Sequence, residues 1–332
     1  MRFDARKTAG GALPSVPDRA ARFLLAAAAA ILLTAPGDPA VAQPLYKYRG
    51  ENGEWIYADR PPVDGSVAEV RELAPESSAG GFTVIHEFAG QAVVLKARNR
   101  FFAPIEVTLE IRAIRGLECP HPDLELRWVV PARSELPILT LPMADDGAAP
   151  YLDYGYRYLA GDPAAHHRPP GPYRVPFAVS TRHPVTQAFP EVATHTTPDS
   201  RHAIDVAMPI GTNIFAARDG VVFDVASTNF SAGLDPVKDG PNANVVRILH
   251  DDGTYAIYAH LNTNSIRVKP GDRVRRGDYI ADSGNTGFSS GPHLHFVVVR
   301  NAGMVVESVP VRFAGQPDEV VTPASGMVLT AY

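Results

Sequence analysis

The sequence feature that most constrains this chain is the run Gly291-Pro292-His293-Leu294-His295-Phe296. Two histidines one residue apart lead into the apolar residues 297–299, a pattern that predicts a β-strand. Side chains at positions i and i+2 of a strand point to the same face of the sheet. His293 and His295 can therefore share one cleft, where one binds a metal ion and the other lies beside it. Taken alone, the pair is equally compatible with two histidines on a solvated strand face.

A second group of metal-binding residue types lies upstream, with His195 in Thr194-His195-Thr196 and Asp205 in Ala203-Ile204-Asp205. Together with the histidine pair, these segments resemble the lysostaphin/LytM-type zinc metallopeptidases, which cut peptide bridges in bacterial cell walls. The resemblance extends from about Pro172 to Phe313. It rests on five ordered blocks: Asp205 to Thr212, Ala216 to Val222, Tyr258 to Leu261, Ser283 to Gly287 and Gly291 to Phe296.

The resemblance implies an all-β chain whose C-terminal domain, residues 172–315, has the barrel-like duplicated hybrid motif of LytM-type peptidases. The residues themselves also favour strands there. Asn244 to Leu249 and Tyr255 to His260 flank Asp251-Asp252-Gly253, which is a hairpin signal. No long helix is expected outside the N-terminal segment, and residues 316–332 are expected to form a C-terminal tail.

Residues 1–42 have the pattern of a secretory signal peptide. Basic residues precede the apolar run Phe23 to Ala35, and Ala40-Val41-Ala42 is a small-residue cleavage site. The run is too short to span a bilayer comfortably, and no other stretch approaches that length. The residue directly after the cleavage site is Gln43 and not a cysteine, so a lipid anchor is not expected. We therefore predict secretion across the inner membrane to the periplasm, with no stable membrane span after cleavage.

Two further units are expected before the peptidase domain. Residues 43–81 are predicted to form a small β-hairpin module and a linker, because Leu45 to Tyr48 and Trp55 to Tyr57 flank a Glu-Asn-Gly turn. Residues 82–171 contain several short apolar runs, and in Ile105 to Ile111 the apolar residues alternate as in a half-buried strand. This spacing predicts a β-sandwich-like accessory domain. Such a domain positions or covers the enzyme and is a candidate surface for a regulatory partner.

Composition argues against several classes of function. The formal net charge is −5, and removal of residues 1–42, with five basic and three acidic side chains, takes it to −7. An acidic protein is a poor partner for nucleic acid or for an anionic membrane surface. Cys119 is the only cysteine, so no internal disulfide can form, and no motif around it supports a catalytic thiol.

Catalytic zinc sites typically use three protein ligands and leave a fourth position open. The resemblance assigns His295 and Asp205 as two of them. The third ligand is less clear, because the commonest family pattern has a histidine four residues before the aspartate, where this chain has Arg201.

Two histidines compete for the third place. His202 stands three residues before Asp205, an odd offset that puts it on the opposite face of a strand, although a β-bulge at Ala203 would correct this. His195 lies further upstream, and the loop from Thr197 to Ser200 can bring it back over Asp205. We favour His195 and keep His202 as the alternative.

His260 and His293 take the remaining roles that the resemblance implies. They flank the water that the metal activates; one acts as general base, and both stabilise the oxyanion. Zinc lowers the pKa of a bound water to roughly 7, and a histidine can pass its proton to the leaving amine. Considered alone, His260 is equally well explained as a core histidine after Tyr258.

Other candidate positions are better explained structurally. Ser283 to Gly291 is glycine-rich but lacks the Lys-Ser/Thr of a phosphate loop. His250 is expected to be structural, and the joint around His166 and His167 is expected to be a solvated linker. Ser289 and Ser290 are weak candidates for substrate contact.

The sequence thus predicts a secreted Zn²⁺-dependent endopeptidase that hydrolyses peptide cross-links of bacterial peptidoglycan. The cell-wall substrate comes from the resemblance, and the bond that is cut is not specified. The main alternative is a catalytically inactive LytM-type regulator that binds or activates another cell-wall hydrolase. A metallopeptidase that acts on soluble proteins is a further alternative.

Overall fold

The computed structural model describes residues 43–49, 55–58, 69–73, 81–119 and 126–332, and the signal peptide predicted for residues 1–42 lies outside them. Strands dominate the described residues, among which the helices are the short α1 (Pro236–Asp239) and η1 (Gly240–Asn242). The predicted all-β class is confirmed. In this part of the chain, no helix is long and apolar enough to cross a membrane.

A small antiparallel sheet with strand order β2-β1-β3 precedes the larger domains. β1 (Gln43–Arg49) pairs with β2 (Trp55–Ala58), as the predicted hairpin requires. β3 (Glu69–Leu73) pairs with the other edge of β1, inside the stretch that was expected to be linker. The linker prediction is therefore wrong for these residues, whose charged sequence Glu-Val-Arg-Glu-Leu suits the edge of a sheet.

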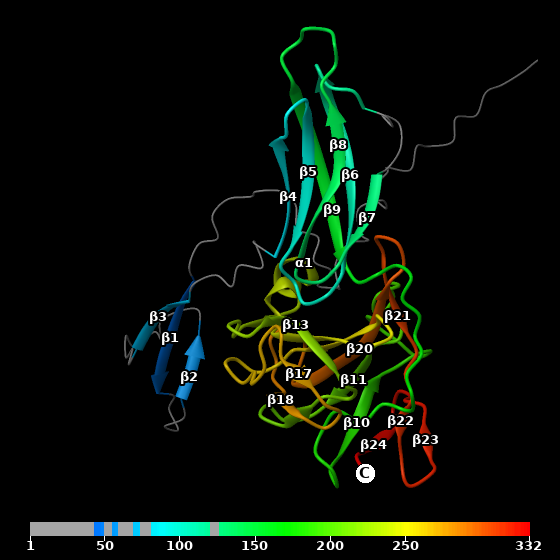
Figure 1. Cartoon of the computed structure of the whole chain (residues 1–332). Coiled ribbons are helices and arrows are strands. Elements are labelled where there is room, and N and C mark those ends of the chain that lie inside the picture. Colours follow the sequence, from blue (N-terminus) through cyan, green and yellow to red (C-terminus); the bar gives the residue numbers. More distant parts are fainter. Residues whose placement is uncertain (1–42, 50–54, 59–68, 74–80, 120–125) are drawn as a thin grey trace, which may run out of the picture.

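The accessory domain is the predicted β-sandwich (Figure 1). One sheet has the order β4 (Phe82–Phe88), β5 (Ala92–Asn99), β8 (Ser134–Pro142), and the other has the order β7 (Leu126–Val130), β6 (Ile105–Arg115), β9 (Tyr151–Ala160). Ile105, Val107 and Leu109 are at most 2% exposed and belong to one cluster with Leu95 of the facing sheet. Burial of such apolar side chains between two sheets is the main stabilising term of a sandwich.

The predicted peptidase domain is built on a nine-stranded sheet, with the order β17-β13-β15-β16-β20-β11-β10-β24 and β21 paired to β20. The hairpin predicted around Asp251 to Gly253 joins β15 to β16. The strands of the nine-stranded sheet are β17 (Arg273–Val274), β13 (Gly220–Ala226), β15 (Val245–Leu249), β16 (Tyr255–Ala259), β20 (His293–Asn301), β11 (Ile204–Ala207), β10 (Arg182–Gln187), β24 (Val328–Thr330) and β21 (Val306–Val309). Three two-stranded pairs complete the domain: β12 (Asn213–Phe215) with β18 (Tyr279–Asp282), β14 (Ala232–Gly233) with β19 (Gly287–Phe288), and β22 (Phe313–Ala314) with β23 (Val320–Val321).

The C-terminal residues are part of this sheet. β24 pairs antiparallel with β10, with Leu329 opposite His183. Leu329 and Ala331 are 1% and 2% exposed and lie in the peptidase core. The expectation of a C-terminal tail over residues 316–332 is therefore wrong, because the chain returns to cover an otherwise unpaired edge of the sheet.

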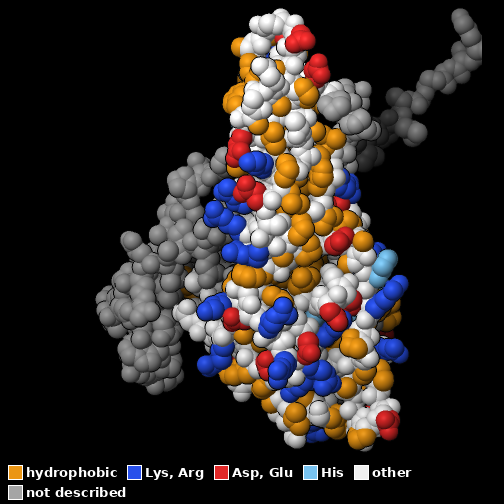
Figure 2. Space-filling model, viewed as in Figure 1, with side chains coloured by type: hydrophobic (Ala, Val, Ile, Leu, Met, Phe, Trp, Pro, Cys, Tyr) orange, Lys and Arg blue, Asp and Glu red, His pale blue; other side chains and the backbone are white. Residues whose placement is uncertain are grey.

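The two large domains share apolar contacts. Phe223, Tyr255 and Val299 of the peptidase sheet belong to the same buried cluster as the sandwich core. The joint between the domains is also ordered against the peptidase domain: the ring of His167 stacks on Tyr173, and its Nε2 lies 3.1 Å from the Tyr173 hydroxyl. His167 is therefore not in a solvated linker, and burial lowers its pKa. On the face shown in Figure 2, acidic and basic side chains intermingle over the peptidase domain.

Candidate metal centre and active site

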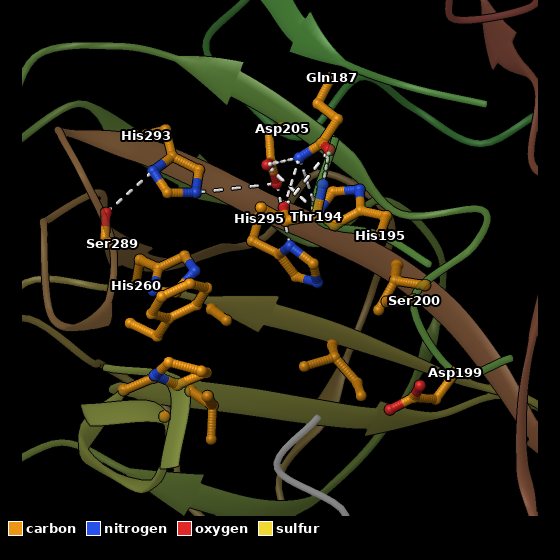
Figure 3. A pocket seen from close by; sticks show the side chains of 18 of the residues that line it. Gln187, Thr194, His195, Asp199, Ser200, Asp205, His260, Ser289, His293 and His295 are labelled. Atoms are coloured by element: carbon orange, nitrogen blue, oxygen red, sulfur yellow. Dashed lines mark hydrogen bonds and ion pairs between the residues drawn. The ribbon is translucent and has the colours of Figure 1, made fainter. Parts of the chain in front are cut away.

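Strand register brings the first two candidate ligands together. β11 lies between β10 and β20, and Asp205 is the Cα partner of His295 on one side and of Gln187 on the other. Partners in adjacent strands point to the same face, so their side chains meet above the sheet (Figure 3). Nδ1 of His295 lies 2.9 Å from Oδ1 of Asp205.

His195 reaches the same place from the segment that connects β10 to β11. The backbone N–H groups of Ser200 and Arg201 donate to the carbonyl of Thr197, and this turn folds the chain back. His195 is 5% exposed, and its Nε2 lies 3.2 Å from Oδ2 of Asp205. Its ring meets that of His295 edge to face, with centroids 4.9 Å apart.

His202 lies elsewhere. Its ring packs on Phe189 at a centroid distance of 4.8 Å, and its backbone N–H donates to the hydroxyl of Ser308. The structure thus groups His195, and not His202, with Asp205 and His295.

These three residues fit a divalent metal ion. One possible ligand atom from each lies within 4.8 Å of the others, and the set consists of two imidazoles and a carboxylate. Nδ1 of His295 and Nε2 of His195 lie 2.9 and 3.2 Å from the two carboxylate oxygens of Asp205. Nδ1 of His195 is buried without a hydrogen-bond partner in the described part of the chain. A nitrogen-rich set of three ligands is the donor chemistry that zinc prefers at catalytic sites.

The cluster favours an ionised carboxylate. Burial alone would raise the pKa of Asp205, but its hydrogen bonds with His195 and His295 outweigh burial and hold that pKa well below its usual value. Burial lowers the pKa of His295, opposed by Asp205. A carboxylate beside neutral imidazoles is the protonation state in which all three residues can coordinate a metal.

The two other histidines lie beside this cluster. The ring centroid of His260 is 4.5 Å from that of His293 and 5.8 Å from that of His295. Nδ1 of His260 lies 2.7 Å from the carbonyl oxygen of Thr286. Because a carbonyl can only accept, Nδ1 carries the proton, and Nε2 is left with a free lone pair. Burial, followed by the neighbouring histidines, lowers the pKa of His260 to about 3.

His293 has a different set of partners. Its Nδ1 lies 2.8 Å from the carbonyl oxygen of Gly291 and 3.3 Å from the hydroxyl of Ser289. Its Nε2 lies 3.7 Å from Oδ1 of Asp205. This nitrogen therefore points toward the carboxylate but lies beyond hydrogen-bond distance of it.

Comparison with known proteins agrees with this geometry. Residues 199–307 match the sequence profile of peptidase family M23. These residues belong to family M23. His195 precedes the matched stretch, so its place in the M23 site rests on the geometry described above.

Three relatives of the M23 domain illustrate the family. An uncharacterised metalloprotease of Buchnera aphidicola is 43% identical over 95 residues, which are 29% of this chain and 22% of that protein. The peptidoglycan DD-endopeptidase ShyA of Vibrio cholerae is 37% identical over 117 residues (35% of this chain, 22% of that protein). The glycyl-glycine endopeptidase ALE-1 of Staphylococcus capitis is 31% identical over 103 residues (31% of this chain, 25% of that protein). The chain thus matches a quarter or less of the length of each of these relatives.

Gln187 is a residue of this site that sequence reasoning missed. Its Nε2 donates to Oδ2 of Asp205 at 2.9 Å, and its Oε1 accepts from the backbone N–H groups of Ala193 and Thr194 at 2.5 and 2.6 Å. Gln187 therefore ties the segment that carries His195 to the ligand carboxylate. Alternation alone would place Gln187 with Val185 on the core side, but a register shift between these two residues turns Gln187 toward the cleft.

A cleft of about 1070 Å³ surrounds the five histidine and aspartate side chains. Its floor follows β16 and β20 of the M23 domain. The segment from Ala193 to Ser200 lines it on one side, and α1, η1 and the stretch from Phe288 to Pro292 line it on the other. Ser289 lines the cleft and contacts His293, and the Thr286 carbonyl contacts His260.

Proposed function

We propose that this protein is a Zn²⁺-dependent endopeptidase that hydrolyses the peptide cross-links of bacterial peptidoglycan. The observation that carries the proposal is the convergence of His195, Asp205 and His295, with His260 and His293 beside them, on one cleft. The substrate class is supported by the M23 relatives, two of which are named as a peptidoglycan DD-endopeptidase and a glycyl-glycine endopeptidase.

His195, Asp205 and His295 are proposed as the metal ligands. When bound, zinc supplies Lewis-acid activation of a water and of the scissile carbonyl. Asp205 also matters electrostatically, because its negative charge faces three histidines. This charge stabilises a proton on a neighbouring imidazole while the reaction proceeds.

His260 and His293 are proposed as the catalytic residues that move protons. His260 holds its Nδ1 proton against the Thr286 carbonyl, so its Nε2 is free to accept a proton from the attacking water. Burial lowers the pKa of His260 and opposes this step, whereas the charge of Asp205 favours it. His293, with Nε2 toward Asp205, carries a proton and donates it to the substrate carbonyl oxygen or to the leaving amine. Water and a peptide bond give a carboxylate and an amine, and no covalent enzyme intermediate is needed.

The compartment is also part of the proposal. The basic, apolar and small-residue segments of residues 1–42 support export across the inner membrane. Peptidoglycan cross-links lie outside that membrane. Export to the periplasm would therefore place the protein with its proposed substrate.

The competing function is a LytM-type regulator without catalytic activity. A regulator has no need to keep three metal ligands and two further histidines in one cleft. The complete cluster therefore favours the enzyme.

Digestion of purified cross-linked peptidoglycan tests the proposal. The wild-type protein and a His293→Ala variant are incubated with it, with and without a chelator, and the released fragments are identified by mass spectrometry. We expect chelator-sensitive loss of cross-linked dimers for the wild type alone. Folded, zinc-loaded protein that releases no fragments, but stimulates another wall hydrolase, would establish the regulator instead.

A further inference from the structure

The catalytic cluster and the accessory domain occupy one face of the same sheet. On β20, alternate residues share a face, so Val297 and Val299 continue the line of His293 and His295. On the paired strand β16, Ala259, Ile257 and Tyr255 lie opposite His295, Val297 and Val299. Four residues of strand cover about 13 Å, which separates Ala259, opposite His295, from Tyr255; both residues line the cleft.

The sandwich covers the far end of this face. Val297 and Val299 are 2% and 0% exposed, and they lie in one buried cluster with Tyr158 and Ala160 at the end of β9. The His295 end of the same strands is in the cleft. The accessory domain thus begins where the cleft ends.

Buried polar groups hold this junction. Glu106 of β6, whose side chain is 0% exposed, accepts from Nδ2 of Asn301 and from the backbone N–H of Met304, both at 2.7 Å. Asn301 Nδ2 also donates to the carbonyl of Gly161 at 3.1 Å. Gly161 has φ +104, and a Cβ there would lie 3.1 Å from Cβ of Asn301. The chain that follows β9 is therefore fitted closely to the end of β20.

At one end of the cleft, the lining residues come from both domains. At the sandwich end they include Leu159 and Ala160 of the accessory domain, next to Tyr255, Val297 and Val306 of the peptidase domain. At the other end the lining residues, among them Ala207 and Pro292, all belong to the peptidase domain. The trough along β16 and β20 therefore has one end made by the sandwich.

We propose that Leu159 and Ala160 form a fixed end wall of the substrate cleft and limit the length of peptide that fits on that side of the scissile bond. An extended chain advances about 3.3–3.6 Å per residue, so about 13 Å admits at most about four residues. The accessory domain is then a specificity element of the peptidase. This inference rests on the proposed function, because it assumes that the cleft cleaves peptides.

Two series of synthetic peptides test the wall. Each carries the bond that the protein cuts in cross-linked peptidoglycan and is lengthened by up to about six glycines on the acyl side or on the amine side. We expect kcat/KM to fall by about tenfold or more beyond about four residues in one series only. Leu159→Trp should move this limit inward, and the milder Leu159→Ala should move it outward. Leu136→Trp, on the partly exposed surface of the same domain, is the matched control and should leave it unchanged.

The outcomes separate the two proposals. Equal tolerance of both extensions, or a limit that neither Leu159 variant moves while both remain folded and keep their metal, would overturn the end wall. If folded, zinc-loaded protein cleaves neither the peptides nor peptidoglycan, the proposed endopeptidase function itself is contradicted.

Discussion

Asp205 and His295 are partners on adjacent antiparallel strands, and Nδ1 of His295 lies 2.9 Å from Oδ1 of Asp205. A rigid sheet therefore presets two of the three proposed ligands. We expect His295→Ala to lose bound zinc and activity together. His293→Ala should keep most of its zinc and lose about 10²- to 10⁴-fold in turnover, the usual contribution of a general acid or base. The zinc content and the cleavage rate of each variant are measured on the same preparation. Full activity of His293→Ala would show that His293 has no catalytic role.

The neighbouring histidines His195 and His202 form a matched pair of variants. His195 faces Asp205, whereas His202 packs on Phe189. His195→Ala should therefore purify without stoichiometric zinc, and His202→Ala should purify with it. Loss of zinc from the His202 variant alone would reverse the assignment.

Gln187 is predicted to act on the metal through Asp205. Its amide donates to the ligand carboxylate and accepts from the segment that carries His195. Loss of such a supporting group typically weakens metal binding about 10- to 100-fold. Gln187→Ala should show this loss in competition with a chromophoric chelator, and Gln316→Ala, at an exposed position, should not. Equal affinities would make Gln187 irrelevant to the metal.

Glu106 is predicted to stabilise the junction of the two domains. Its buried carboxylate accepts from Asn301, Met304 and Arg127, and loss of one partner from a buried charged network costs about 3–5 kcal/mol. Glu106→Ala should lower the free energy of unfolding by about that amount in urea titration. Glu110→Ala, at an exposed position of the same strand, should change it by less than about 0.5 kcal/mol. Similar effects of the two substitutions would contradict the role of the junction.

His250 lies away from the active site, and its protonation is expected to make the free energy of unfolding depend on pH. Burial lowers its pKa to about 4 from a model-peptide value of 6.5, with further effects from Asp219, Arg218 and Asp252. The unfolded chain therefore binds a proton more readily, so the contribution of neutral His250 is complete above pH 6.5 and is lost as the pH falls toward 4. The loss amounts to at most about 3 kcal/mol.

Unfolding free energies at pH 7 and pH 5 measure this effect. They should differ less in His250→Asn than in the wild type, because the asparagine amide can still donate to the Asp219 carbonyl but does not titrate. An unchanged difference would show that other groups set the pH dependence.

Much of the site could be predicted because it follows from strand alternation and from family motifs. The spacing of His293 and His295 places both on one face, and the structure has them there. The return of the chain to bring His195 near Asp205 depends on a turn at Thr197, which the sequence allowed but did not require. Gln187 could not be found, because a register shift reverses the alternation on which the prediction depends.

The junction of the domains was also beyond sequence reasoning. Val297 and Val299 read only as apolar strand residues, and nothing local indicates that a sandwich, rather than solvent or substrate, covers them. The short strands β3 and β24 were missed for a related reason. They pair with distant segments, and their own residues carry little periodic signal.

A zinc titration of metal-free protein tests the central claim most directly. Protein stripped by a chelator receives zinc in small steps, and the release of fragments from cross-linked peptidoglycan is measured at each step. Release should rise from zero and level off at about one zinc per chain, because three ligands form one site. Release that persists in the stripped protein, or that is absent at full occupancy, would contradict a zinc-dependent wall endopeptidase.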